Sequence, residues 1–191
     1  MESTKNNKQI NRLIDHTLLK ADATREQIKT LCKEALEYHF FSVCINPFYV
    51  SFAKEILKES DVSVCTVIGF PLGANATETK VYETKKAISD GADEIDMVIN
   101  IGAIKNKEWE LVEKDIHEVV LAASPKIVKV IFETCLLSDD EKIKACKIAS
   151  SNGMTCSFVS ASSFLETLSI IICFCDIGSV VTFSINVNCI I

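Results

Sequence analysis

The sequence predicts an α/β fold in which short strands alternate with longer helices. Between about residue 13 and residue 159, runs rich in β-branched residues alternate with longer amphipathic runs, a pattern typical of a parallel sheet built from βα units. The 191 residues are 48% hydrophobic and 24% charged, with six Gly and three Pro, which is the composition of an ordinary folded domain. Collagen-like and strongly disordered classes are therefore excluded.

Six strand–helix units can be counted in this part of the chain. Thr24 with Gln27, and Ser138 with Glu141, have the spacing of capping boxes and predict where two helices begin. The strands are expected at residues 13–18, 41–45, 62–68, 94–101, 127–132 and 155–159. The other helices are expected after Asn46-Pro47, from Thr77, and over the apolar stripe from Trp109 to Ala123, with Gly91 and Gly153 as terminators.

The net charge limits the kinds of binding partner that the chain can have, and its cysteines indicate the cellular compartment. Lys and Arg total 20 against 26 Asp and Glu, a net charge of −6, so the chain lacks the basic field that would hold nucleic acid or an anionic membrane. The nine cysteines are odd in number and no two have the C-x2-C spacing of zinc or redox sites, which predicts reduced thiols in the cytoplasm and no structural metal. Residues 1–12 are polar and show no secretory signal.

The character of the chain changes near residue 155. Residues 148–191 contain no Lys or Arg, and residues 160–191 carry neither capping signals nor a helical period, so they are expected to form a divergent tail apart from the 1–159 barrel portion. The apolar stretch 168–191 has Asp176 at its middle, which argues against a membrane span. The tail is expected to leave the edges of the first and sixth strands uncovered.

Charged residues inside apolar strands are the first candidates for chemistry, because a buried charge is costly without a partner or a function. Asp96 and Lys129 each lie on the polar face of an apolar strand, and the strands are expected to be neighbours. Two interpretations remain open for this pair: a structural ion pair, or an acid/base couple. Asp15 in the first strand is a further polar intrusion, equally compatible with a hydrogen-bonded strand end and a site. Residues 69–73 predict at least a tight turn.

Five blocks carry a more specific resemblance. The blocks are Ile14–Lys20, Val43–Pro47, Val64–Gly73, Glu94–Gly102 and Val128–Leu137. In their order and spacing they resemble the deoxyribose-phosphate aldolase family, and the match covers about residues 10–159.

The resemblance implies a TIM (β/α)8 barrel and a class I aldolase that needs no cofactor or metal. The family cleaves 2-deoxyribose 5-phosphate to acetaldehyde and glyceraldehyde 3-phosphate through a Schiff base. A small sugar phosphate is then the expected partner, and a homo-oligomer is one expected state. By the same resemblance Asp96 matches a proton shuttle, Lys129 belongs to its polar cluster, Asp15 and Thr17 line the pocket, and Cys44 lies near it.

The sixth strand departs from the family. Where the family reads approximately F-V-K-T-S-T-G-F, this chain reads Phe158-Val159-Ser160-Ala161-Ser162-Ser163-Phe164, so Ser160 stands at the position of the Schiff-base Lys. The second catalytic Lys and the Gly-rich turns after strands seven and eight are also missing. The expected fold is therefore an incomplete TIM-type barrel of about six βα units followed by an atypical apolar tail.

Two explanations of this departure compete. One is a non-catalytic pseudoenzyme or interaction module that retains part of the sugar-phosphate pocket. The other is a competent gene whose product changes reading frame, or retains an intron, near residues 155–160. In either case the activity of this chain is expected to be absent or impaired.

Overall fold

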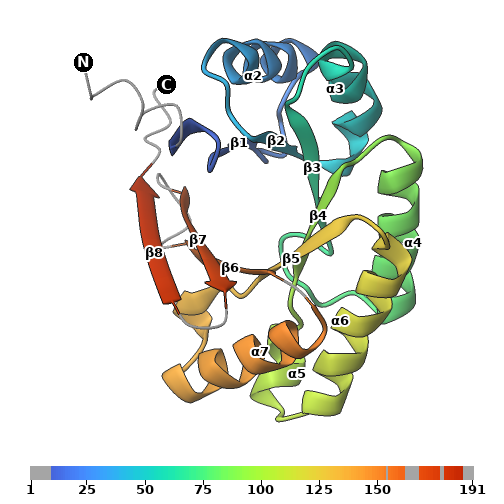
Figure 1. The fold of residues 1–191 in the computed structure, drawn as a ribbon. Coiled ribbons are helices and arrows are strands. Elements are labelled where there is room, and N and C mark those ends of the chain that lie inside the picture. Colours follow the sequence, from blue (N-terminus) through green and yellow to red (C-terminus); the bar gives the residue numbers. More distant parts are fainter. Residues whose placement is uncertain (1–9, 154, 162–167, 177–178, 187–191) are drawn as a thin grey trace. The chain divides into compact units, whose positions relative to one another are not determined.

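The computed structural model describes residues 10–153, 155–161, 168–176 and 179–186, with side chains described up to residue 153. Helices and strands succeed one another from α2 to α7, with α5 and α6 both between β4 and β5, and the last described elements are the strands β6, β7 and β8 (Figure 1). No helix among the described residues is long and apolar enough to cross a membrane. The residues group into two compact units, Met1–Val67 with Lys85–Ile95, and Ile68–Thr84 with Asp96–Ile191.

The first unit contains three parallel strands in sequence order. The pairs are β1 with β2 and β2 with β3, and the register places Thr17 opposite Cys44 and Cys44 opposite Cys65. The elements are β1 (Asp15–Leu18), α2 (Arg25–Glu37), β2 (Ser42–Ile45), a short 3-10 helix (Pro47–Tyr49), α3 (Val50–Leu57) and β3 (Ser63–Ile68). The α/β alternation that the sequence predicts is present here.

Two local features of this unit follow from the sequence signals. Thr24 and Gln27 form the predicted capping box at the start of α2, whose buried side chains are Ile28, Leu31, Cys32 and Ala35. Asp93 accepts from Lys54 of α3 at 2.6 Å and from the backbone N–H of Val64 at 3.1 Å, so one carboxylate ties a helix to a strand. Gly91 has φ +106°, and a Cβ there would lie 2.8 Å from Lys54, so the residue suits only glycine.

The second unit holds most of the remaining elements, while residues 85–89 of α4 and residues 94–95 of β4 belong to the first unit. β5 pairs with β6 in parallel, and the N–H of Ile99 just after β4 donates to Ile131 of β5 at 3.0 Å. The elements are α4 (Thr77–Ser89), β4 (Glu94–Val98), α5 (Ile101–Lys105), α6 (Trp109–Ala123), β5 (Ile127–Ile131), a 3-10 helix (Thr134–Leu136), α7 (Asp139–Ser151), β6 (Thr155–Ala161), β7 (Leu168–Asp176) and β8 (Ser179–Asn186). The helix predicted over Trp109 to Ala123 and the capping box of Ser138 and Glu141 are both confirmed.

One predicted strand is too long. The sequence predicts a strand over residues 94–101, whereas β4 ends at Val98 and α5 begins at Ile101. The Asn100 side chain accepts from the N–H of Ala103 at 3.0 Å and so caps a new helix instead of lying on the polar face of the strand. An apolar run of this kind does not reveal its own end, because a cap inside it competes with strand propensity.

The tail also differs from expectation. Within the described part of the tail, β7 pairs with β6 in antiparallel fashion and β8 pairs with β7. The expectation that the edge of the sixth strand stays uncovered is therefore wrong. Residues 170–175 are Ile, Cys and Phe only, a composition that favours a strand over a helix. The remaining tail positions, 162–167, 177–178 and 187–191, lie outside the described residues.

A fully buried ion pair joins α4 to α6. Lys80 has no exposed surface, and its Nζ lies 2.5 Å from Oδ2 of Asp115, which is also buried. The same Nζ donates to the backbone oxygen of Val98, the last residue of β4, at 3.1 Å. One ammonium therefore holds two helices and the end of a strand. Removing one partner of such a pair leaves the other as a buried charge.

We expect Lys80→Met to lower the free energy of unfolding by about 3–5 kcal/mol, because the Asp115 carboxylate stays buried without its cation. Lys80→Met/Asp115→Leu should lose less, because both charges leave together. Urea denaturation followed by circular dichroism measures both. Lys86→Met is the control: its partner Asp90 lies in an exposed pair, which contributes no more than about 1 kcal/mol. Equal losses for the Lys80 and Lys86 variants would contradict the prediction.

A second, exposed ion pair joins α5 to α7. Lys105 Nζ lies 2.6 Å from a carboxylate oxygen of Glu141, which also accepts from the N–H of Ser138 in the capping box. The hydrogen bond from Lys105, with that from Ser138, lowers the pKa of Glu141. A lowered native pKa means that the ionised carboxylate stabilises the fold above its unfolded pKa and loses this effect as the pH falls through the native pKa.

We therefore expect Glu141→Gln to melt at a lower temperature than the unchanged chain at neutral pH. The difference should shrink as the pH falls from about 4.3 through the lowered native pKa, because a protonated glutamate resembles glutamine. Thermal melts at a series of pH values measure it. A difference that grows on acidification would show that the charge of Glu141 does not act through this pair.

Candidate active site

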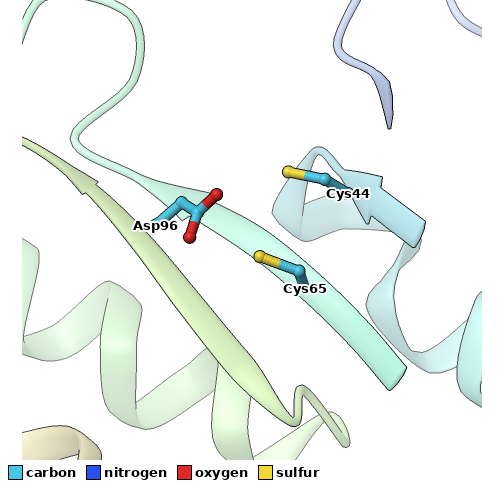
Figure 2. Close-up of side chains that lie close together, drawn as sticks. All are labelled: Cys44, Cys65 and Asp96. Atoms are coloured by element: carbon cyan, nitrogen blue, oxygen red, sulfur yellow. The ribbon is translucent and has the colours of Figure 1, made fainter. Parts of the chain in front are cut away.

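Asp96 and Lys129 meet in the structure as the sequence predicts. Asp96 is the third residue of β4 (Figure 2) and Lys129 the third residue of β5. Their charged atoms, Oδ1 and Nζ, lie 3.2 Å apart, and the two residues are 8% and 4% exposed. Side chains alternate along a strand, so the polar faces of β4 and β5 bring these residues together while Met97 and Val130 take the opposite faces. The result is a nearly dry carboxylate–ammonium pair.

The loop that follows β3 packs tightly against the end of β4. Gly69 and Gly73 have φ +64° and +66°, and the N–H of Gly73 donates to the oxygen of Gly69 at 2.8 Å, so the predicted turn is confirmed. A Cβ on Gly73 would lie 2.1 Å from the backbone oxygen of Ile99. The N–H of Gly69 donates to Glu83 at 2.9 Å. The N–H groups of Gly69 and Gly73 are thus both engaged within the protein, and the turn supports the end of β4.

Asp15, Thr17 and Cys44 lie in the first unit. Asp15 accepts from the Ser42 hydroxyl at 2.5 Å, across the β1–β2 pair, and the Thr17 hydroxyl donates to the backbone oxygen of Asp15 at 2.9 Å. Cys44 is buried opposite Thr17. Asp15 and Thr17 therefore form hydrogen bonds within the strands. That Asp15, Thr17 and Cys44 line a pocket stays a prediction.

Ser160 lies on β6, where its backbone is paired with Ser169 of β7 in antiparallel register. Its side chain lies outside the described part of the chain. The position at which the resemblance expects the nucleophile is thus on a strand with paired backbone.

The sequence reasoning missed two features near this strand pair. Lys80 and Asp115 sit at helical spacing within the buried stripes of α4 and α6, where a charged residue signals a buried partner. Glu133, four residues after Lys129, has φ +46°, an uncommon conformation for a residue other than glycine. The thiol of Cys135 donates a hydrogen bond to the carboxylate of Glu133 at 3.3 Å. Strained backbone of this kind concentrates at functional sites.

Comparison with known proteins identifies a family and several relatives that match this chain. The family model described as DeoC/LacD family aldolase matches residues 10–158. The chain belongs to this aldolase family. It is 58% identical over 159 residues to the deoxyribose-phosphate aldolase of Lactococcus lactis subsp. lactis, covering 83% of this chain and 71% of the relative. It is 62% identical over 143 residues to that of Coprothermobacter proteolyticus, covering 75% of this chain and 65% of the relative.

Solved aldolase structures agree with the sequence comparison. A candidate deoxyribose-phosphate aldolase from Coccidioides immitis has a TM-score of 0.79 and 42% identity over 83% of this chain, and the tetrameric deoxyribose phosphate aldolase of Aeropyrum pernix has 0.72 and 30% over 78%. The likeness confirms the predicted α/β class of the TIM-barrel aldolases. This chain spans 62% and 63% of the length of those two structures.

We expect Asp96 and Lys129 to be energetically coupled. Asp96→Asn and Lys129→Met should each lower the free energy of unfolding, and the double variant should lose at least about 1 kcal/mol less than the sum, because the second change no longer breaks the pair. Urea denaturation of the four forms gives the coupling energy. Asp96→Asn combined with Lys142→Met, a half-buried residue of α7 paired with the exposed Asp139, should be additive within about 0.5 kcal/mol. Additivity in both cycles would mean that the 3.2 Å contact contributes nothing.

Proposed function

We propose that this chain derives from a deoxyribose-phosphate aldolase and that it is inactive or impaired in Schiff-base chemistry. The family's reaction is cleavage of 2-deoxyribose 5-phosphate to acetaldehyde and glyceraldehyde 3-phosphate. The proposal rests on one observation above all: the buried Asp96–Lys129 pair on β4 and β5 of a chain that shares more than half of its matched residues with named deoxyribose-phosphate aldolases. Asp96 is the proposed proton shuttle, and Lys129 holds its carboxylate in place.

The chemistry of residue 160 decides the second half of the proposal. An imine forms when an amine attacks a carbonyl carbon and water leaves, so the nitrogen must come from the protein. Ser160 offers a hydroxyl, which can add to a carbonyl but cannot give an imine. Without the imine there is no electron sink for cleavage of the carbon–carbon bond. Lys129 does not replace the missing amine in this proposal, because an ammonium paired with a carboxylate has no free electron pair.

The remaining expectations follow from the same proposal. The partner is a small sugar phosphate, bound near Asp15, Thr17 and Cys44. The compartment is the cytoplasm, in keeping with the cysteines of the described residues, none of which forms a disulfide. A homo-oligomer is compatible with the proposal, since the relative from Aeropyrum pernix is tetrameric. The barrel portion is proposed to end at residue 159 and the divergent tail to begin at residue 160.

A non-catalytic binding module is the second candidate, and the tail supports it. Pairing of β7 with β6 covers an edge that a truncated barrel would leave open, as an evolved protein is expected to do. A change of reading frame or a retained intron is the competing origin. Sequencing the transcript separates them: a shifted frame that encodes K-T-S-T-G near residue 160 would identify the second origin.

Reductive trapping tests the proposed loss of imine chemistry. We expect the chain incubated with acetaldehyde and sodium borohydride to show no stoichiometric ethyl adduct by intact mass and peptide mapping. Ser160→Lys supplies the missing amine and is the matched variant, in which an adduct at residue 160 is expected. A stoichiometric adduct at Lys129 of the unchanged chain would overturn the inactive assignment and identify a relocated nucleophile.

Turnover and binding of 2-deoxyribose 5-phosphate separate the two candidate functions. Binding without turnover by the unchanged chain supports the binding module, and turnover contradicts the proposed loss of activity. In either case Asp96→Asn should reduce turnover in any active form while leaving the unfolding transition cooperative, because an amide cannot shuttle a proton.

A further inference from the structure

A lysine side chain from α4 holds the end of β4. The Nζ of Lys80 donates to the backbone oxygen of Val98, the last residue of β4, at 3.1 Å. Lys80 has no exposed surface and Val98 is 1% exposed, so bulk water does not compete for this hydrogen bond. A hydrogen bond from a charged donor is stronger than one between neutral groups, and a buried site strengthens it further. The ammonium therefore limits how far the end of β4 can move.

Two backbone contacts reach the same end of β4. The N–H of Ile99 donates to the oxygen of Ile131 on β5 at 3.0 Å. A Cβ on Gly73 would lie 2.1 Å from the oxygen of Ile99 and 2.9 Å from that of Val98, so the backbone of this loop touches the strand end. Val98 and Ile99 are therefore confined by a helix side chain, a neighbouring strand and a loop.

The position of Asp96 depends on this strand end. Asp96 precedes Val98 by two residues, so it lies about 7 Å along the strand from the backbone that Lys80 holds. The Oδ1 atom of Asp96 lies 3.2 Å from Nζ of Lys129, and both residues are buried. This distance is at the upper end of the usual hydrogen-bonding range of about 2.7–3.2 Å, so a small displacement of β4 against β5 weakens the contact.

We propose that Lys80 is a positioning residue for Asp96. By holding the oxygen of Val98 it fixes the end of β4, and so it keeps the carboxylate of Asp96 against Lys129. Asp115, whose carboxylate contacts the Lys80 ammonium, is its buried counterion. That this placement serves proton transfer rests on the proposed function, whereas the placement itself does not.

A double-mutant cycle measures the placement. The coupling factor of Asp96 and Lys129 is the ratio between the unfolding constant of Asp96→Asn/Lys129→Met and the one expected from the two single variants. It should be at least about fivefold in the unchanged chain, and within about twofold of one in the Lys80→Met/Asp115→Leu background. Urea denaturation followed by circular dichroism gives the constants. A purely structural role of Lys80 would lower the stability of all four forms alike and leave the coupling factor unchanged.

Asp115→Asn is the matched control within the same ion pair. The Oδ1 atom of Asp115 has no hydrogen-bond partner within the described part of the chain, so an amide nitrogen in its place breaks no bond. The amide oxygen can still accept from Lys80, and the Lys80 amine can still donate to Val98, whether it is charged or neutral. The variant should be less stable, because a buried charge loses its counterion, yet the coupling factor should stay within about twofold of that of the unchanged chain.

Two glycine variants test the same strand end without altering the ion pair. Gly73 and Gly153 both have a left-handed backbone, with φ +66° and +74°. Gly73→Ala places a methyl group against the oxygens of Val98 and Ile99, whereas a Cβ on Gly153 has no heavy atom of the described residues within 4 Å apart from its chain neighbours. Gly73→Ala should therefore bring the coupling factor to within about twofold of one, and Gly153→Ala, with comparable backbone strain, should leave it unchanged.

These outcomes decide the proposal independently of the proposed function. A coupling factor that stays at about fivefold or more in Lys80→Met/Asp115→Leu or in Gly73→Ala would overturn it. Equal losses of coupling in Lys80→Met/Asp115→Leu and Asp115→Asn, or a factor near one in the unchanged chain, would also overturn it. Either set of variants is sufficient where a member of the other does not fold. All the measurements are unfolding transitions, so a result on turnover or imine formation changes the proposed function and leaves these results as they stand.

Discussion

The buried contact between Lys80 and Asp115 organises the second unit. The Lys80 ammonium touches the carboxylate of α6 and the last backbone oxygen of β4, and its side chain packs so closely on Gly69 that a Cβ there would lie 2.9 Å away. A charge that is desolvated to this degree is stable only with these partners in place. The helix positions, the end of the strand and the conformation of the preceding turn are therefore not independent.

The candidate site depends on this arrangement through one strand. Val98, whose oxygen Lys80 holds, lies two residues after Asp96 on β4, and Gly73 presses on the residue that follows. Asp96 in turn pairs with Lys129 on β5. A carboxylate that exchanges protons has to be held to within a fraction of an ångström, and residues on strands with a supporting second contact achieve this better than residues on loops. The polar pair is thus supported by a second ion pair from the helices.

The two-residue periodicity of β-strands predicted the part of this arrangement that lies on β4 and β5. Asp96 and Lys129 could be paired in advance because each interrupts an apolar strand, and a charge in such a place needs a partner. Lys80 was missed because the buried stripe of α4 is itself polar, with Thr77 and Thr84 on either side, so no apolar background made the charge conspicuous. The pairing of β7 with β6 was missed for another reason: partner choice between strands is a long-range property that local composition does not specify.

Many residues specify the fold of this chain, whereas the covalent chemistry of the family depends on a single residue. Membership of the aldolase family is encoded by many residues over positions 10–158, each contributing a small share of packing or capping. Imine formation requires one nitrogen at one place, and no number of conserved neighbours supplies it. In the proposed function Ser160 accounts for the loss of the covalent step, and a change at this one position leaves in place the features that identify the family. The Asp96–Lys129 pair belongs to the distributed part, because each residue neutralises the buried charge of the other, so the structural role of the pair does not depend on imine formation.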